Sequence, residues 1–441
     1  MSIKETLKSK FSVGVKKYTL NTLWMLFEKS LRIIAEIFVG IWVARYLSPE
    51  NYGILNFSLS YVFVFSAVAS LGLDRIIVRE LVRDEKRRDV ILGTSFTLKI
   101  IGAIILLLLL VISLFIFQID NTTSVFILII GISFIFKSFN IIESYFQAKV
   151  LAKYPAWSNT IMLFFSSLLK IILILFKAPL IAFVIVVLLE SIVLALFYLV
   201  FYKRRKLKVT LWKVDRTEAK RLLLISWPLM LSGVVVAILM RIDQLMIEWL
   251  MGSYNYVGQY AAAVRLSEGW SFISVVIITS LFPAIINAKK NNSEIYNQRM
   301  QRLYDLLVWL AVLIAIPSTI FADIIFRYLY GVAYLGSAIV LKIHVWSAVF
   351  GFIGVAYTQW LIVEGFTKKA LYRSLFGVIT NIILNILMIP KFGIKGAAIA
   401  TLISQIAANI GYDFFDPDVR VALKQKVKAL FFINTIKKII G

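Results

Sequence analysis

The chain contains about a dozen apolar stretches, each long enough to cross a bilayer as a helix. A helix rises about 1.5 Å per residue, so roughly 20 apolar residues span a hydrocarbon core of about 30 Å. Six stretches lie near residues 20–44, 51–73, 91–117, 122–148, 155–176 and 180–202, and six more near 222–248, 255–286, 304–322, 336–363, 371–389 and 396–412. Because unpaired backbone groups are not tolerated in lipid, the pattern predicts an all-α integral membrane protein with about 12 transmembrane helices.

Composition agrees with this class. Hydrophobic residues make up 60% of the 441 residues, charged residues only 16%, and the mean hydropathy is +0.87. A soluble domain has about 25% charged residues. The chain contains no cysteine, which excludes disulfides and thiolate metal sites.

Basic residues between the stretches predict the orientation in the membrane. If the N-terminus is cytoplasmic, the outer loops contain only Arg45, Lys177, Arg327, Lys391 and Lys395, and most other Lys and Arg residues face the cytoplasm. The positive-inside rule therefore places both termini in the cytoplasm. The net charge of +24 then reflects topology and attraction to anionic lipid. Nucleic acid is not an expected partner, because the basic residues do not form one patch.

A basic segment at 203–221 divides the stretches into two sets of six. Ser48-Pro49-Glu50-Asn51-Tyr52-Gly53 follows the first stretch, and the similar Ser253-Tyr254-Asn255-Tyr256-Val257-Gly258 follows the seventh, 205 residues later. Six spans per half with cytoplasmic termini require parallel repeats, related by an axis along the membrane normal. We therefore expect an N-terminal six-helix lobe at 1–202, a cytoplasmic basic linker at 203–221, a C-terminal six-helix lobe at 222–412 and a cytoplasmic amphipathic tail at 413–441.

The tail alternates apolar and basic residues. Its pattern is typical of an amphipathic helix on the cytoplasmic membrane surface, and a solvated tail without function is the alternative. The apolar positions are Val419, Leu423, Val427, Leu430 and Phe431, and the basic ones are Lys424, Lys426 and Lys428.

Charged residues inside the apolar stretches indicate a function. A charge at the bilayer centre costs about 2.5–3.5 kcal/mol on insertion scales, so it normally faces a bundle interior or a wet cavity. The basic ones are Lys29, Arg32, Lys99, Lys137, Lys170, Arg241, Arg265 and Lys342, and the acidic ones are Glu28, Glu36, Glu143, Glu190, Asp243, Glu248, Glu268 and Glu364. So many buried charges predict a polar path through the membrane, and hence a transporter.

The first stretch has the most suggestive arrangement. Glu28, Arg32 and Glu36 are four residues apart and share one helical face, with Lys29 beside them. One interpretation is a self-neutralising ladder that helps the helix insert. We favour a switchable site, in which a cation binds an anionic substrate beside carboxylates that hold a proton or Na⁺, since apolar residues would build a purely structural helix at lower cost.

These considerations give two sets of candidate site residues. The cations expected to line a substrate cavity are Lys29, Arg32, Lys99, Lys137, Arg241, Arg265 and Lys342, and the ion-coupling candidates are Glu28, Glu36, Asp243, Glu268 and Glu364. Snorkelling towards a helix end is the alternative for the lysines that lack an acidic neighbour at close helical spacing, namely Lys99, Lys137, Lys170 and Lys342. The single histidine, His344, is interpreted as a packed polar residue.

Enzymatic motifs are absent from the sequence. It contains no P-loop and no paired-histidine zinc motif, and its outer loops are short. We therefore expect neither an enzyme nor ATP-driven transport by this chain alone, no metal or catalytic residue, and no cofactor apart from H⁺ or Na⁺ as a coupling ion.

Several motifs occur in an order that resembles a known family. Ser226-Trp227-Pro228-Leu229 with Ser232-Gly233 and Arg241-Ile242-Asp243-Gln244 resembles the seventh helix of bacterial polysaccharide flippases. Val257-Gly258-Gln259-Tyr260, Arg265-Leu266-Ser267-Glu268 and Ser280-Leu281-Phe282-Pro283 continue the pattern, and Ala44-Arg45-Tyr46-Leu47 and Gly393-Ile394-Lys395-Gly396 are similar too. The chain thus resembles the Wzx-like O-antigen and polysaccharide flippases of the multidrug/oligosaccharidyl-lipid/polysaccharide exporter superfamily.

The resemblance implies two lobes around a central cavity framed by helices one, two, seven and eight. It implies a multi-pass protein of the bacterial cytoplasmic (inner) membrane that moves undecaprenyl-diphosphate-linked repeat units, of the O-antigen (lipopolysaccharide) or capsule type, to the outer leaflet by ion-coupled alternating access, as an antiporter does. Lys29, Arg32 and Arg265 occupy places comparable to cationic residues of lipid-II flippases. Expected partners are the lipid-linked oligosaccharide, the bilayer, and a polysaccharide polymerase with its chain-length machinery.

Two alternatives stay open. A cation-coupled multidrug exporter of the same superfamily would share the fold, although cationic cargo favours a more acidic cavity. A non-transporting membrane polymerase of the sugar pathway is the other alternative, and the short outer loops argue against it.

Overall fold

The computed structural model describes the backbone of residues 3–431 and most of their side chains. The side chains of 3–23, 25–27, 29–30, 33–34, 283 and 290–291 are outside the description. The described part contains helices and no strand. Ten of its helices are long and apolar enough to cross a membrane, or eleven if the bent pair Val332–His344 and Ser347–Val363 forms one span. The first of the ten, Ala35–Arg83, contains a backbone break and so belongs to two successive spans. The prediction of an all-α, multi-pass membrane protein with about 12 spans is confirmed.

The break lies at Ser48, inside α1 (Ile3–Ser70). Its φ of 61° and ψ of 165° are non-helical, in a left-handed region that disfavours a side chain. Pro49 then takes the first position of the next helix, where its missing N–H is not needed. The Ser48-Pro49 pair thereby divides a 68-residue helical segment into two spans.

Packing divides the chain into two compact units. The first comprises Met1–Val43 and Ser58–Ala237, and the second comprises Ala44–Phe57 and Ile238–Gly441. The short segment around the break in α1 is therefore packed with the second unit. The predicted lobe limits at residues 202 and 222 stay a prediction.

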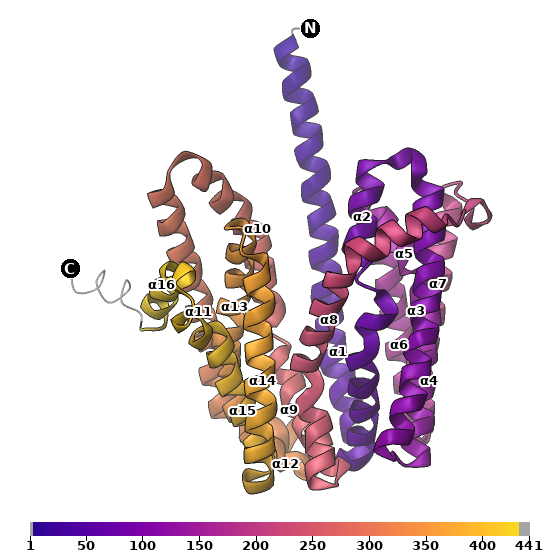
Figure 1. Cartoon of the computed structure of the whole chain (residues 1–441). Helices are drawn as coiled ribbons and strands as arrows, with labels where there is room; N and C mark the ends of the chain where they lie inside the picture. Colours follow the sequence, from indigo (N-terminus) through magenta and orange to yellow (C-terminus); the bar gives the residue numbers. More distant parts are fainter. Residues whose placement is uncertain (1–2, 432–441) are drawn as a thin grey trace. The chain divides into compact units, whose positions relative to one another are not determined.

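Unit 1 is a helical bundle (indigo to magenta in Figure 1). Besides α1 it contains α2 (Asp74–Arg83), α3 (Arg88–Phe117), α4 (Asn121–Lys137), α5 (Ile141–Ala148), α6 (Lys153–Leu175), α7 (Leu180–Arg204) and the first part of α8 (Arg216–Met251). Helix α4 packs on α3 and α7, α6 packs on α7, and α2 packs on α5. Leu73, Ile77, Ile142 and Phe146 lie fully or almost fully buried in its core.

Unit 2 continues from the end of α8 (pink to yellow in Figure 1). It contains α9 (Tyr254–Glu268), α10 (Ser271–Asn291), α11 (Ser293–Ile325), α12 (Leu335–His344), α13 (Ser347–Val363), α14 (Thr367–Phe392), α15 (Ile394–Asn409) and α16 (Arg420–Leu430). Helices α14 and α15 form an antiparallel hairpin, α9 packs on α12, and α11 packs on α10, α12 and α13. Met300, Tyr304, Phe352 and Tyr357 lie in its core.

The two copies of the internal echo touch each other within unit 2. A Cβ on Gly53 would lie 1.8 Å from the carbonyl oxygen of Tyr254, and a Cβ on Gly258 would lie 1.9 Å from that of Pro49. The contact is reciprocal, because a shift of 205 residues converts Gly53 into Gly258 and Pro49 into Tyr254. Such reciprocity is the signature of a two-fold contact between repeats.

Helix α16 lies within the segment predicted to be an amphipathic tail, but one of its sides is covered by other parts of the protein. Lys426, expected to be on the polar side, is fully buried and ion-paired with Asp413. Its Nζ lies 3.4 Å from the ring centre of Tyr357 and donates to the carbonyl oxygen of Asn409 over 2.6 Å. Burial lowers the pKa of Lys426 to about 7, although the Asp413 carboxylate acts in the opposite direction. Residues 432–441 of the predicted tail lie outside the described residues.

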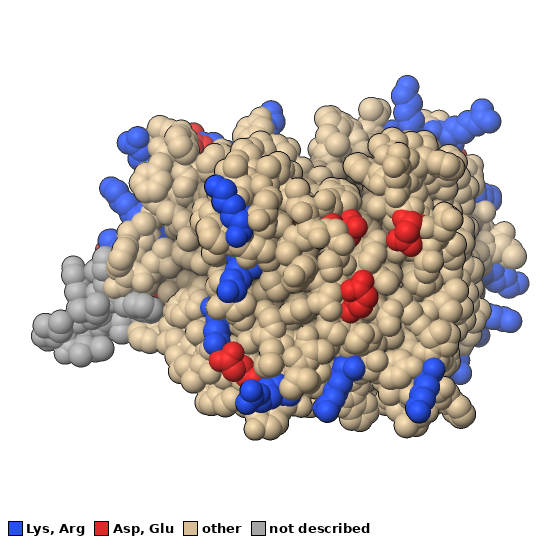
Figure 2. All heavy atoms as spheres, turned by 90° about the horizontal axis from the view of Figure 1, so that it is seen from below, with Lys and Arg blue, Asp and Glu red and all other residues tan. Residues whose placement is uncertain are grey.

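Charges are sparse on the face at the lower end of the view in Figure 1. Figure 2 shows this face, where most of the surface is neither basic nor acidic and several Lys or Arg side chains follow one another in a line left of the centre. The orientation of the chain in the membrane stays a prediction.

The reciprocal contact predicts that Gly258→Ala will destabilise the protein by about 1–3 kcal/mol, because the new methyl group must displace backbone. Thermal unfolding of the purified protein in detergent measures the effect. Gly411→Ala is the control, since its Cβ would meet neighbours only at 3.8 Å or beyond. Equal stability of both variants would contradict the proposed tight contact.

The buried pair Lys426–Asp413 predicts a non-additive pair of substitutions. Lys426→Met and Asp413→Leu should each destabilise unit 2, by about 3–5 kcal/mol, because each leaves a buried charge without its main partner. The double variant should recover a large part of the loss. Thermal unfolding of all four proteins tests this, and additive effects would refute the coupling.

Candidate functional site

In unit 1, polar side chains from four helices approach one another. On α1, Arg32 Nε lies 3.6 Å from Oε1 of the buried Glu28. On α5, Glu143 Oε2 accepts a hydrogen bond from Tyr198 of α7 over 2.9 Å, and the same hydroxyl lies 3.4 Å from Asn159 Oδ1 of α6. Glu28 and Arg32 lie close enough to Tyr198 to interact with it electrostatically. The predicted site on the first span is therefore part of a larger polar cluster.

Two of the candidate cations are paired with carboxylates on other helices. Lys99 of α3 is buried and ion-paired with Asp74 at the start of α2. Lys342 of α12 lies 2.6 Å from Asp323 Oδ2 of α11. Neither lysine relies on snorkelling alone, because a partner on a neighbouring helix neutralises it.

Two lysines share the surroundings of one carboxylate in unit 1. Lys170 Nζ lies 2.7 Å from Glu190 Oε1, which also accepts a hydrogen bond from Ser166. Lys137 is half-buried at the end of α4, with its Nζ 4.0 Å from the ring centre of Phe134, and Glu190 attracts it electrostatically. This cluster contains more positive than negative charge, so it suits an anion better than a cation.

The centre of unit 2 is built around Asp243 of α8. Its Oδ1 accepts a hydrogen bond from Asn385 Nδ2 of α14 over 2.6 Å. Its Oδ2 accepts one from Tyr260 of α9 over 2.8 Å and one from Thr401 of α15 over 2.5 Å. Asn385 also donates to Asn381 Oδ1 over 3.1 Å, while its own buried Oδ1 has no partner among the described residues. The hydroxyl oxygens of Tyr260 and Thr401, and the Asn385 Oδ1 once the amide turns, are the kind of oxygen ligand that a hard cation such as Na⁺ takes beside a carboxylate.

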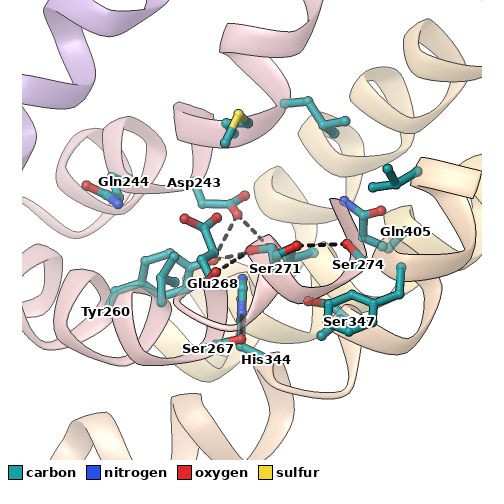
Figure 3. A pocket seen from close by; sticks show the side chains of 18 residues that line it. Asp243, Gln244, Tyr260, Ser267, Glu268, Ser271, Ser274, His344, Ser347 and Gln405 are labelled. Carbon is teal, nitrogen blue, oxygen red and sulfur yellow. Dashed lines mark hydrogen bonds between the residues drawn. The ribbon is translucent and has the colours of Figure 1, made fainter. Parts of the chain in front are cut away.

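A cavity adjoins this carboxylate (Figure 3). Ser267 on its wall shares a 2.8 Å hydrogen bond with Nδ1 of the buried His344, so the histidine is packed and also lines the cavity. Glu268 lies on the same wall, with Arg241 NH1 3.9 Å from its Oε2. Arg241 and Asp243 have different partners, as expected for positions two apart on a helix.

The remaining candidates lie elsewhere. Glu36 is exposed on α1, and Arg265 is half-buried on α9. Glu364, just after α13, lies 2.8 Å from Lys289 Nζ and accepts a 2.8 Å hydrogen bond from Tyr296. The side chain of Lys29 lies outside the described residues. The proposed roles of all the candidate residues stay predictions.

Sequence reasoning missed the neutral residues that hold Asp243. Tyr260, Asn385 and Thr401 come from three helices, and no spacing along the chain links them to α8. One signal was present: Asn381 and Asn385 are four residues apart in an otherwise apolar span, and polar residues on one face of such a span normally point into the bundle.

Residues 19–289 match the family model described as polysaccharide biosynthesis protein. The chain belongs to this family. The match begins in α1 and ends in α10, so it includes the polar cluster of unit 1 and Asp243, Glu268 and Arg241 of unit 2.

Two similar proteins come from Haloferax volcanii. The "Probable low-salt glycan biosynthesis flippase Agl15" is 25% identical over 154 residues, and the "Probable flippase AglR" is 29% identical over 166 residues. The chain spans only about a third of the length of each, 32% and 34%. The capsular polysaccharide biosynthesis protein CapF of Staphylococcus aureus is 22% identical over 401 residues, which is 89% of this chain and 97% of CapF.

Solved structures share the fold. An inward-facing multidrug resistance transporter of the MATE family superposes with a TM-score of 0.71 at 15% identity, over 92% of this chain and 96% of that one. The lipid II flippase MurJ, in an inward closed conformation, superposes with a TM-score of 0.70 at 17% identity, over 95% and 92%. At such low identity the likeness describes the fold alone.

The geometry around Asp243 predicts an ion-dependent stability. Asp243→Asn should fold, because the Asn385 amide can turn its unpaired Oδ1 towards the new amide group. We expect Na⁺ to raise the thermal unfolding temperature of the wild-type protein and to leave this variant unaffected. Choline controls for ionic strength, and Glu294→Gln, at an exposed position that is not a candidate, controls for loss of a carboxylate elsewhere. An equal response of Asp243→Asn and the wild type would exclude Asp243 as the ion site.

Proposed function

We propose that the protein is a flippase for oligosaccharides linked to a polyprenyl diphosphate. It moves undecaprenyl-diphosphate-linked repeat units from the cytoplasmic to the outer leaflet of a bacterial inner membrane by alternating access. One combined observation carries the proposal: the chain belongs to a polysaccharide biosynthesis family, and its spanning helices contain charged and polar clusters. The names of Agl15 and AglR support a flippase.

Cationic side chains bind the diphosphate in this proposal. Arg32 is the strongest candidate in unit 1, because its side chain is 42% exposed despite its contact with Glu28. Arg241 and Arg265 are the candidates in unit 2, and Lys137 is a further one. Arginine suits this task because its planar guanidinium can donate two parallel hydrogen bonds to a phosphate. Lys99 and Lys342 are weaker candidates, because an aspartate already neutralises each of them.

A coupling ion supplies the driving force. Asp243 is the main candidate because it connects α8, α9, α14 and α15 through its hydrogen bonds. Binding of H⁺ or Na⁺ there removes the charge that holds these donors, so the ion shifts the balance between two packings of the helices. Glu28 and Glu268 are the further candidates.

A multidrug exporter of the same superfamily is the second candidate function. The likeness to a multidrug resistance transporter supports it at the level of the fold. The cluster of Lys137, Lys170 and Glu190 in unit 1 argues for an anionic cargo instead.

Deletion of the gene in its host tests the proposal. We expect loss of surface polysaccharide, with single lipid-linked repeat units trapped on the cytoplasmic leaflet. Single units that reach the outer leaflet without being joined would indicate a polymerase. Normal polysaccharide with new sensitivity to cationic drugs would indicate the exporter.

Within the proposal, Arg32→Gln and Arg265→Gln should each reduce flipping by about tenfold or more, because a charged hydrogen bond to the cargo is lost. Complementation of the deletion strain, with protein levels measured by immunoblot, checks this. Arg204→Gln serves as the control, since this exposed residue ends α7 and is not a candidate. Full activity of both test variants would exclude the proposed cationic site.

A further inference from the structure

The cavity beside Asp243 is large enough for a small molecule. It encloses about 210 Å³ within unit 2, where α8, α9, α10, α12, α13 and α15 line it. At about 30 Å³ per molecule, this is room for roughly seven waters, which is the size class of one sugar ring. Figure 3 shows side chains from several helices converging on it.

Gly351 on the cavity wall indicates close approach of another group. Glycine inside a helix costs about 0.5–1 kcal/mol relative to alanine, so it needs a reason. One turn away, Gly354 has one, because its Cβ would lie 2.3 Å from Asn409 Oδ1. A Cβ on Gly351 would meet nothing within 4 Å. Packing within the described chain therefore does not explain this glycine, whereas a ligand lying against the helix backbone does.

Hydrogen-bonding groups with spare capacity surround the same space. Among the described residues, Ser347 Oγ and Gln405 Nε2 have no hydrogen-bond partner, and the Glu268 carboxylate accepts no hydrogen bond. His344 uses Nδ1 for Ser267, which leaves Nε2 for another group. Figure 3 shows Glu268, Ser347 and Gln405 around the cavity. These side chains provide one strong acceptor, the Glu268 carboxylate, and one amide donor, Gln405. Ser347 and His344 can act as either donor or acceptor.

This lining discriminates between classes of ligand. Two carboxylates, Asp243 and Glu268, line the cavity, and Arg241, which lies 3.9 Å from Glu268, is not among the lining residues, so a phosphate inside the cavity would be repelled. Organic cations are usually held against aromatic faces, but the phenol rings and phenyl rings here are limited to Tyr260 and Phe352. A sugar ring presents several hydroxyls, each both donor and acceptor, and so matches the mixed set around Gly351.

We propose that this cavity is a sugar subsite: it receives one neutral sugar ring of the cargo, flat against the α13 backbone at Gly351. The ring hydroxyls donate to Glu268 and accept from Gln405, with Ser347 and His344 completing the contacts. This subsite rests on the proposed function, because a flippase of lipid-linked oligosaccharides is what brings a sugar to it. It deepens that function by separating sugar recognition from diphosphate binding.

Binding of a lipid-free oligosaccharide tests the subsite. The probe is the host's own repeat-unit oligosaccharide, released from its lipid by mild acid, so that it carries neither diphosphate nor polyprenol. Equilibrium binding to the purified protein is compared in the wild type, Gly351→Ala, Gly351→Phe and Ser347→Ala. Flipping of the intact lipid-linked unit in vesicles is measured in parallel at increasing substrate density.

We expect saturable binding to the wild type, a small change for Gly351→Ala, and binding about tenfold weaker or worse for Gly351→Phe, whose ring fills the cavity. Ser347→Ala should weaken binding by about threefold to tenfold without adding bulk. The half-saturating density of the lipid-linked unit should rise in the same order. Unfolding temperatures equal to that of the wild type would show that each variant is folded.

Two results would overturn the subsite. In the first, the wild-type protein flips the lipid-linked unit but does not bind the free oligosaccharide saturably, or Gly351→Phe leaves both the binding and the half-saturating density unchanged. The proposed function would then stand without this site. The other is binding of tetraphenylphosphonium that depends on Gly351 while the oligosaccharide does not compete, which assigns the cavity to organic cations. Absence of flipping by the wild type, with efflux of drugs, would instead refute the proposed function itself.

Discussion

A charge inside a spanning helix must find a partner, and much of the interior of both units follows from this constraint. Removal of an ion from water is expensive in a medium of low dielectric, and attraction to an opposite charge offsets the expense only at short distance. Lys99 therefore ties α3 to α2, Lys170 ties α6 to α7, and Lys342 ties α12 to α11. Apolar side chains can slide over one another in lipid, whereas these contacts fix which helices are neighbours.

The spanning helices and the charged residues within them could be predicted from the sequence, but most of the partners of those charges could not. Spacing along a helix finds pairs such as Glu28 and Arg32, because four residues return to the same face. Partners on different helices, such as Asp323 for Lys342, are set by tertiary packing and have no local signature. Lys426 shows the same limit, since its neighbours in the sequence suggest a solvated face while Asp413 holds it inside. The Ser48-Pro49 break was predictable as a boundary, and its left-handed backbone was not.

The polar centre of unit 2 combines two chemical tasks in one place. Asp243 has its lone pairs committed to donors from three other helices, so its charge state determines how firmly those helices are held. The neighbouring cavity contains groups that are less committed, among them Glu268 and Ser347. A carboxylate whose hydrogen bonds are already made, such as Asp243, suits a conformational switch. Donors and acceptors with few partners suit a ligand that must enter and leave the cavity. The distinction rests on hydrogen-bond occupancy, which composition cannot reveal.

The reciprocal contact of Gly53 with Tyr254, and of Gly258 with Pro49, also constrains how the chain can change over time. In an internally repeated protein, the two copies usually diverge in sequence, because each packs against different neighbours. Here the two copies pack against each other. A substitution in one half alters a contact on which the other half depends. Changes at these positions in the two halves therefore constrain each other, even where the rest of the two sequences has diverged.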